Sequence, residues 1–159
     1  MENINKKILE MNSKEGLLVE FDIFINSRIN GCHFVIEDDT ELKEIRSIIN
    51  NIKYIDKSSS IFCCTYGVNI IDGKPFIYCD NVWVKTTLSI DDINAIFIKY
   101  DYEYNPLRPI IPSNITLLSE EEINNNNIKY IVLSDGSIHK YIDSLPTIKF
   151  DKFISVYWD

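Results

Sequence analysis

Apolar residues occupy every odd position from Leu17 to Ile25, while Glu20 and Asp22 occupy even positions between them. This period of two predicts a half-buried strand, because successive side chains of a strand point to opposite faces. The pair Asn30-Gly31 is typical of a tight turn. The pattern therefore predicts a hairpin whose return strand runs over residues 32–36.

Two segments instead have the spacing of an amphipathic helix. Asp38 and Glu41 precede apolar residues three and four apart, which predicts a helix over about residues 39–54 with the acids at its positive end. Ser89 and Asp92 form a capping-box pattern, which predicts a second helix over residues 90–99. The competing interpretation of this second segment is a strand from residue 95 to residue 104.

Two Asp-Gly pairs predict further hairpins. Asp72-Gly73 fits a two-residue turn that pairs Ile71 with Lys74 and continues, with a bulge near residues 80–81, into residues 82–84. Pro75 then falls beyond the first hydrogen-bonded pair, which indicates a sheet edge. Around Asp135-Gly136 the same rule predicts these pairs: Leu133 with Ile138, and Val132 with His139.

The remaining segments give weaker patterns. Residues 2–12 fit a short polar helix, residues 119–122 one helical turn, and residues 147–158 a strand or a short helix. Strands in pairs with two main helices between them predict an α+β fold with a mostly antiparallel sheet built from hairpins. At 159 residues we expect a single domain over residues 1–159.

The net charge of −8 limits the classes of partner. A negative field repels nucleic acid and anionic membranes and steers basic proteins toward the surface, so we expect a protein partner, no direct nucleic acid and no membrane. The residues near Met1 lack the apolar run of a secretory signal, which favours the cytoplasm. The chain has many Ile, Asn and Lys and few Arg, a bias typical of an A/T-rich genome. The sequence leaves the oligomeric state open.

No catalytic or cofactor signature is present in the sequence. Cys32, His33, the Cys63-Cys64 pair and Cys79 could meet on neighbouring strands, but their spacing lacks a zinc knuckle. We expect reduced, buried cysteines that pack in the core, and neither a metal nor a cofactor. The glycines are isolated, and no nucleophile motif accompanies the two histidines, so the sequence favours a protein that is not an enzyme.

Tyrosines alternate with carboxylates over residues 100–104, and two prolines follow. Tyrosine is enriched at protein interfaces and carboxylates attract basic partners. The alternation equally fits an edge strand with its rings inward and its acids outward. We predict a partner-binding surface from two segments, the second at the start of the first helix. Its residues are Asp101, Tyr102, Glu103, Tyr104 and Arg108, with Asp38, Asp39 and Glu41 as the second patch.

In size, acidity and lack of catalytic motifs, the chain resembles as a class the immunity proteins that neutralise secreted bacterial toxins. The resemblance implies tight binding to a cognate toxin domain, often a basic nuclease, whose active site is covered by acidic side chains. One alternative is an enzyme or small-molecule-binding domain, with its site where the tyrosines and Arg108 meet the hairpin around Trp83. Another is a host-interaction protein of a pathogen or virus.

Overall fold

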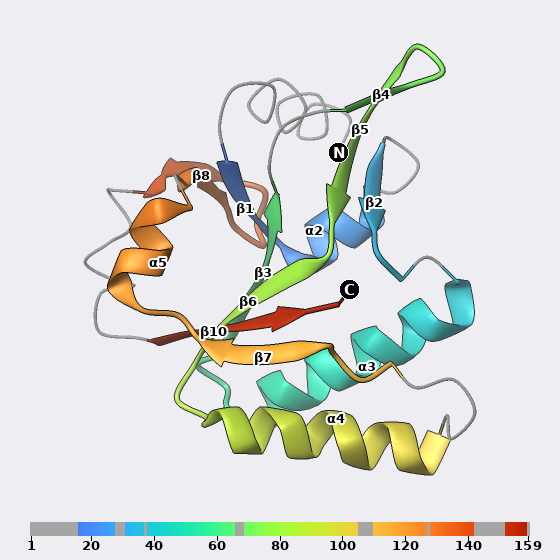
Figure 1. Ribbon diagram of the computed structural model, residues 1–159, viewed down its shortest axis with the longest axis vertical. Helices are drawn as coiled ribbons and strands as arrows, with labels where there is room; N and C mark the ends of the chain where they lie inside the picture. Colours follow the sequence, from blue (N-terminus) through green and yellow to red (C-terminus); the bar gives the residue numbers. More distant parts are fainter. Residues whose placement is uncertain are drawn as a thin grey trace.

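A seven-stranded sheet forms the centre of the molecule, in the order β7-β10-β6-β3-β1-β8-β9 (Figure 1). The computed structural model describes residues 16–27, 31–36, 38–65, 69–104, 110–126, 128–141 and 152–158. The strands of this sheet are β1 (Gly16–Glu20), β3 (Ser60–Thr65), β6 (Asn81–Thr86), β7 (Asn114–Leu117), β8 (Ile128–Val132), β9 (Ile138–Lys140) and β10 (Lys152–Tyr157). All neighbouring strands are antiparallel except β1 and β8.

A second, three-stranded sheet has the order β2-β5-β4. Its strands are β2 (Cys32–Phe34), β4 (Asn69–Ile71) and β5 (Lys74–Cys79). The helices among the described residues are α2 (Phe21–Asn26), α3 (Asp39–Ile55), α4 (Ile90–Tyr104) and α5 (Glu120–Asn125). These elements confirm the predicted α+β class with a mostly antiparallel sheet. The helix predicted over residues 2–12 lies outside the described residues.

Each face of the large sheet carries its own apolar cluster. Val82 and Val84 belong to one cluster, whereas Trp83, between them on β6, belongs to the other. Phe153 and Ile154 on β10 divide in the same way. This division follows from the alternation of side chains along a strand. The first cluster includes the buried residues of α2 and α3, and the second is packed by Ile123 of α5.

The main helix was predicted correctly. Asp38 is the N-cap of α3, and the helix runs from residue 39 to residue 55, one residue past the predicted end. Its apolar stripe is fully buried, and the residues of that stripe are Leu42, Ile45, Ile48, Ile49 and Ile52. Local capping and a 3.6-residue period were sufficient for this prediction because both are encoded within the segment itself.

Helix α4 begins where the capping box predicted it. The Ser89 hydroxyl accepts from the Asp92 N–H at 3.1 Å, and the Asp92 carboxylate accepts from the Ser89 N–H at 3.0 Å. The helix continues to Tyr104, so the alternative strand over residues 95–104 is wrong and the predicted end at residue 99 is too early. No proline or glycine interrupts the segment before Pro106, so nothing in it opposes a continued helix.

The strand predicted from Leu17 to Ile25 is wrong in its second half. The chain leaves the sheet after Glu20 and forms α2, and the Glu20 carboxylate caps this helix by accepting from the Ile23 N–H at 2.9 Å. Strand β1 is buried on both faces, because Leu17 and Val19 pack in the first cluster and Leu18 in the second. The alternation of apolar positions in the sequence therefore did not predict where strand β1 ends.

The predicted hairpin between residues 17–25 and 32–36 does not form. Strand β2 instead pairs in parallel with β5, placing Cys32 opposite Ile77 and Phe34 opposite Cys79. Gly31 has a positive φ of 97°, and its carbonyl accepts from the Ile77 N–H at 2.7 Å. Asn30, the other residue of the predicted turn, lies outside the described residues, and the strand after Gly31 joins a partner more than forty residues later in the sequence.

The Asp72-Gly73 hairpin has the predicted geometry. Both residues have positive φ, 51° and 77°, and Ile71 pairs with Lys74. Pro75 lies opposite Ile70, and the β2–β5 ladder starts only at Ile77, so the proline interrupts no ladder hydrogen bond. Near residues 80–81, where a bulge was predicted, strand β5 instead ends before Asp80. There the chain passes from β5 in the small sheet to β6 in the large one (Figure 1).

The Asp135-Gly136 hairpin forms in a register shifted by one residue. Val132 pairs with Ile138 and Ile131 with His139, so the predicted pairs are wrong. Only Gly136 has positive φ here, and its N–H donates to the Leu133 carbonyl at 2.8 Å. The Asp135 carboxylate accepts from the Ser137 N–H, which favours a longer loop over the two-residue turn.

The two shorter predicted elements are present. Ser119 and Glu122 form a complete capping box at the start of α5, and the helix extends to Asn125, three residues past the predicted turn. Residues 152–157 form strand β10, which resolves the choice between strand and helix in favour of the strand. This strand lies between β6 and β7.

Candidate interaction surface

The acidic patch predicted at the start of α3 is formed. Asp38 and Asp39 are exposed, and Glu41 is half-buried. One carboxylate oxygen of Asp38 accepts from the N–H groups of Thr40 at 3.0 Å and Glu41 at 3.2 Å. Asp38 is therefore committed to capping the helix, whereas Asp39 stands at the solvent-facing start of the same turn. A helix N-terminus favours such carboxylates, so this surface is compatible with a stable α3.

The segment from Asp101 to Tyr104 forms the last turn of α4. Consecutive residues of a helix are turned by about 100° rather than the 180° of a strand, so the period of two in this segment does not correspond to a strand. The interpretation of this segment as an edge strand is therefore wrong. Arg108 lies outside the described residues.

The two predicted patches lie toward the same end of the helical layer. Helices α3 and α4 pack against each other. In Figure 1 they run in opposite directions, so the start of α3 and the end of α4 lie on the same side of the view. Segments separated by about sixty residues of sequence thus lie on one side of the helical layer, where the two helices diverge in this view, and we call the two segments together the acidic end. It comprises residues 38–41 and 101–104.

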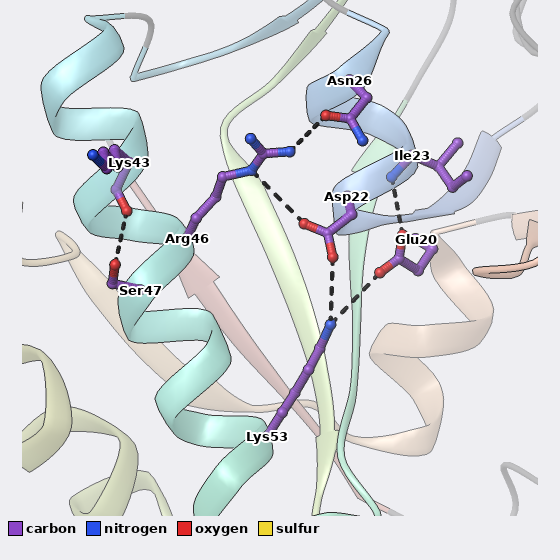
Figure 2. A network of polar contacts seen from close by, with 8 residues as sticks. All are labelled: Glu20, Asp22, Ile23, Asn26, Lys43, Arg46, Ser47 and Lys53. Atoms are coloured by element: carbon purple, nitrogen blue, oxygen red, sulfur yellow. Dashed lines mark hydrogen bonds and ion pairs between the residues drawn. The ribbon is translucent and has the colours of Figure 1, made fainter. Parts of the chain in front are cut away.

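Two cations of α3, Arg46 and Lys53, are engaged within the chain, a feature that the sequence analysis did not predict (Figure 2). The Lys53 ammonium lies 3.6 Å from the Glu20 carboxylate and 3.8 Å from that of Asp22. Arg46 lies 3.8 Å from Asp22 and donates to the Asn26 side-chain oxygen at 2.6 Å. These contacts join α2 to α3. The seven-residue spacing of Arg46 and Lys53 was the available signal, but their acidic partners had been assigned to a strand.

Three cysteines come together where the small sheet meets the large one. The Cys63 thiol interacts with the thiols of Cys79 and Cys32, whereas Cys64 belongs to the opposite face of the sheet. All four cysteines are free and buried, as predicted. Burial, with a smaller contribution from Cys79, raises the pKa of Cys32 to about 12. Burial likewise raises the pKa of Cys63 well above its usual value.

Protonated, buried thiols are poor nucleophiles and poor metal ligands, because both roles require the thiolate. The described part of the chain contains no group of three potential ligands placed to hold a metal ion. His33 contacts the Phe76 ring edge-on, with centroids 5.9 Å apart. In the structure, these cysteines therefore pack in the core.

Trp83, near which the alternative ligand site was expected, lies in the core. It is 1% exposed and packs against Phe153 with ring centroids 5.6 Å apart. Since its partners on this face are apolar, the residue fills the second cluster.

Comparisons with known proteins do not assign the chain to a group. A scan against protein-family models, a search of curated proteins and a search of solved structures each returned no match. Of the helices that the structure describes, none has the length and apolar character needed to cross a membrane.

Proposed function

We propose that the protein is an immunity-type binding module that neutralises a basic toxin domain, a nuclease being the best fit, in the bacterial cytoplasm. The observation that carries the proposal is the acidic end, where the exposed first turn of α3 and the last turn of α4 lie on the same side of the helical layer. The net charge of −8 gives this surface the sign that attracts a cationic partner.

Two carboxylate-bearing helix ends suit such a partner for physical reasons. Charged groups at the rim of an interface accelerate encounter and suppress wrong partners, while buried aromatic residues supply most of the affinity. The surface is also supported on a rigid base, because the residues of the α3 stripe are buried almost completely. A preorganised surface loses less entropy when it binds.

A nucleophilic enzyme has less support in the described residues. The thiols of Cys32 and Cys63 are held protonated, and the acids at the helix starts have structural roles as caps, as Asp38, Asp92 and Glu122 illustrate. A binding role needs none of these groups to react. It needs only that the exposed carboxylates remain accessible.

The test begins with purification of the tagged chain co-expressed with its neighbouring genes, followed by affinity measurement with the recovered partner. Two double variants reverse charge at the acidic end: Asp39→Lys with Glu41→Lys, and Asp101→Lys with Glu103→Lys. The matched control is Glu120→Lys with Glu121→Lys, which changes net charge equally in the exposed first turn of α5.

We expect at least one acidic-end variant to weaken binding by tenfold or more at low salt, while the control weakens it much less. Thermal unfolding of each variant separates lost binding from lost folding. Recovery of no stoichiometric protein partner would contradict the proposed function. Equal losses from all three variants would retain the partner but reject the acidic end as its site.

A further inference from the structure

The last turn of α3 exposes two consecutive apolar side chains. Tyr54 is 77% exposed and Ile55 is 52% exposed, although the preceding stripe residue Ile52 is completely buried. Ile55, three residues after Ile52, continues the apolar stripe of the helix beyond the core, whereas Tyr54 lies beside that stripe on the exposed side of the helix. Such a pair at the end of an amphipathic helix is available for contact with another molecule.

This end of the helix is held firmly in place by Asp56. One oxygen of its carboxylate accepts from the N–H and hydroxyl of Ser58, at 3.1 and 2.6 Å. The other accepts from the Thr86 hydroxyl at 2.8 Å, the Thr87 N–H at 2.8 Å and the Thr87 hydroxyl at 2.9 Å. These bonds join the end of α3 to the segment that leads into α4. Tyr54 and Ile55 are thus presented on a preorganised junction.

The junction and the segment that it joins carry further carboxylates. Asp91 and Asp92 lie in the exposed first turn of α4, and the ionised Asp56 is fixed by its hydrogen bonds, those from Ser58 foremost, which hold its pKa well below the usual range. The carbonyl end of α3 adds partial negative charge. Lys53 is engaged by Glu20 and Asp22, which leaves Lys57 as the cation of the adjoining turn.

We propose that this α3–α4 corner, comprising Tyr54, Ile55 and Asp91, is a docking surface for a cationic segment of the partner protein. A guanidinium or ammonium group of the partner stacks on the Tyr54 ring, its aliphatic stem covers Ile55, and Asp91 pairs with a neighbouring cation. The acidic charge of the corner selects this occupant over a second copy of the acidic chain. The inference rests on the proposed function but concerns the opposite end of α3 from the acidic end.

Site-specific photo-crosslinking locates the contact. The photoreactive residue p-benzoylphenylalanine replaces Tyr54 in one chain and, as the control, Ile70 in another. Ile70 is 74% exposed on the β4–β5 hairpin, far along the chain from the corner. We expect position 54 to cross-link to a Lys- or Arg-rich segment of the co-purified partner, and position 70 to do so at least tenfold less. Cross-linking to a second copy, or equal yields at both positions, would overturn the inference.

Affinity measurement with the same purified partner provides the second readout. Tyr54→Ala and Asp91→Asn should each weaken binding, the former by tenfold or more, whereas Ile70→Ser should leave it within twofold. All three positions are exposed, so folding is preserved. Unchanged affinity in Tyr54→Ala combined with loss in the acidic-end variants would reject the corner while retaining the proposed function. Absence of any partner would reject both.

Discussion

At the residue scale, the two tryptophans are both buried but differ in the hydrogen bonding of the indole N–H. Trp83 is 1% exposed and its indole N–H has no hydrogen-bond partner among the described residues. Trp158 is 6% exposed and its N–H donates to the Ile110 carbonyl at 2.9 Å. Trp158 also contacts the rings of Phe34 and Phe97 edge-on, so it joins β2 and α4 at the end of the first cluster.

Replacing each tryptophan by phenylalanine isolates that difference. Both changes remove the same atoms from a buried site, but only Trp158→Phe removes a hydrogen bond, the one from the indole to the Ile110 carbonyl. We expect Trp158→Phe to be more destabilising than Trp83→Phe by about 1 kcal/mol, the net contribution of one intramolecular hydrogen bond. Urea unfolding followed by circular dichroism measures both. Equal costs would show that this hydrogen bond contributes no net stability.

At the scale of elements, Gly31 and Gly73 occupy left-handed backbone for different reasons. A Cβ on Gly31, whose φ is 97°, would lie 2.8 Å from the Pro75 carbonyl oxygen. A Cβ on Gly73, whose φ is 77°, would meet nothing within 4 Å. Gly31 is therefore required by the close approach of β2 to β5, and Gly73 only by its turn.

Alanine at the two positions should separate strain from steric conflict. Gly73→Ala should cost about 1 kcal/mol, because only the left-handed backbone opposes the side chain. Gly31→Ala should cost about 2–4 kcal/mol, since the neighbouring backbone must also move. Denaturant midpoints at unchanged m-value test the order. A cost for Gly31→Ala no larger than that for Gly73→Ala would mean that β2 shifts freely against β5.

The same elements explain what the sequence could predict. Helix starts at Asp38, Ser89 and Ser119 were predicted because each cap is encoded within a few residues. The parallel pairs β1–β8 and β2–β5 join segments distant in sequence, and no local pattern encodes such a pairing. Register was predicted at Asp72-Gly73 but not at Asp135-Gly136, where the Asp135–Ser137 contact lengthens the loop.

The residues of the candidate surfaces likewise include some features that the sequence could predict and some that it could not. The exposed acids at the start of α3 were predicted because they also cap the helix, so one local signal served both purposes. The exposure of Ile55 could not be predicted, because its spacing of three from the buried Ile52 places it on the apolar stripe of the helix. The secondary structure of residues 101–104 was also missed. There, alternation fits a strand locally, while the buried positions Ile93 and Phe97 continue a helix.

At the scale of the whole molecule, the two sheets meet through a cluster of cysteines. Cys32 comes from β2, Cys79 from β5 and Cys63 from β3, so the cluster spans both sheets. Strands β3 and β5 also pack against each other. Since all three thiols belong to the first apolar cluster, they can be reached by solvent only if the sheets separate or the molecule unfolds.

Thiol labelling therefore reports the stability of the whole assembly. In denaturant, a chromogenic disulfide reagent should react at once with all four thiols of the chain. In the native protein, labelling should be slower by several orders of magnitude, with Cys32, Cys63 and Cys79 reacting at one common rate set by opening. Peptide mass spectrometry at successive times identifies the labelled residues.

Cys32 and Cys79 belong to the small sheet, whereas Cys63 belongs to the large one. Early labelling of Cys32 and Cys79 together with a protected Cys64 would therefore show that the small sheet detaches on its own. One common rate for all four would instead establish that both sheets unfold as a single cooperative unit.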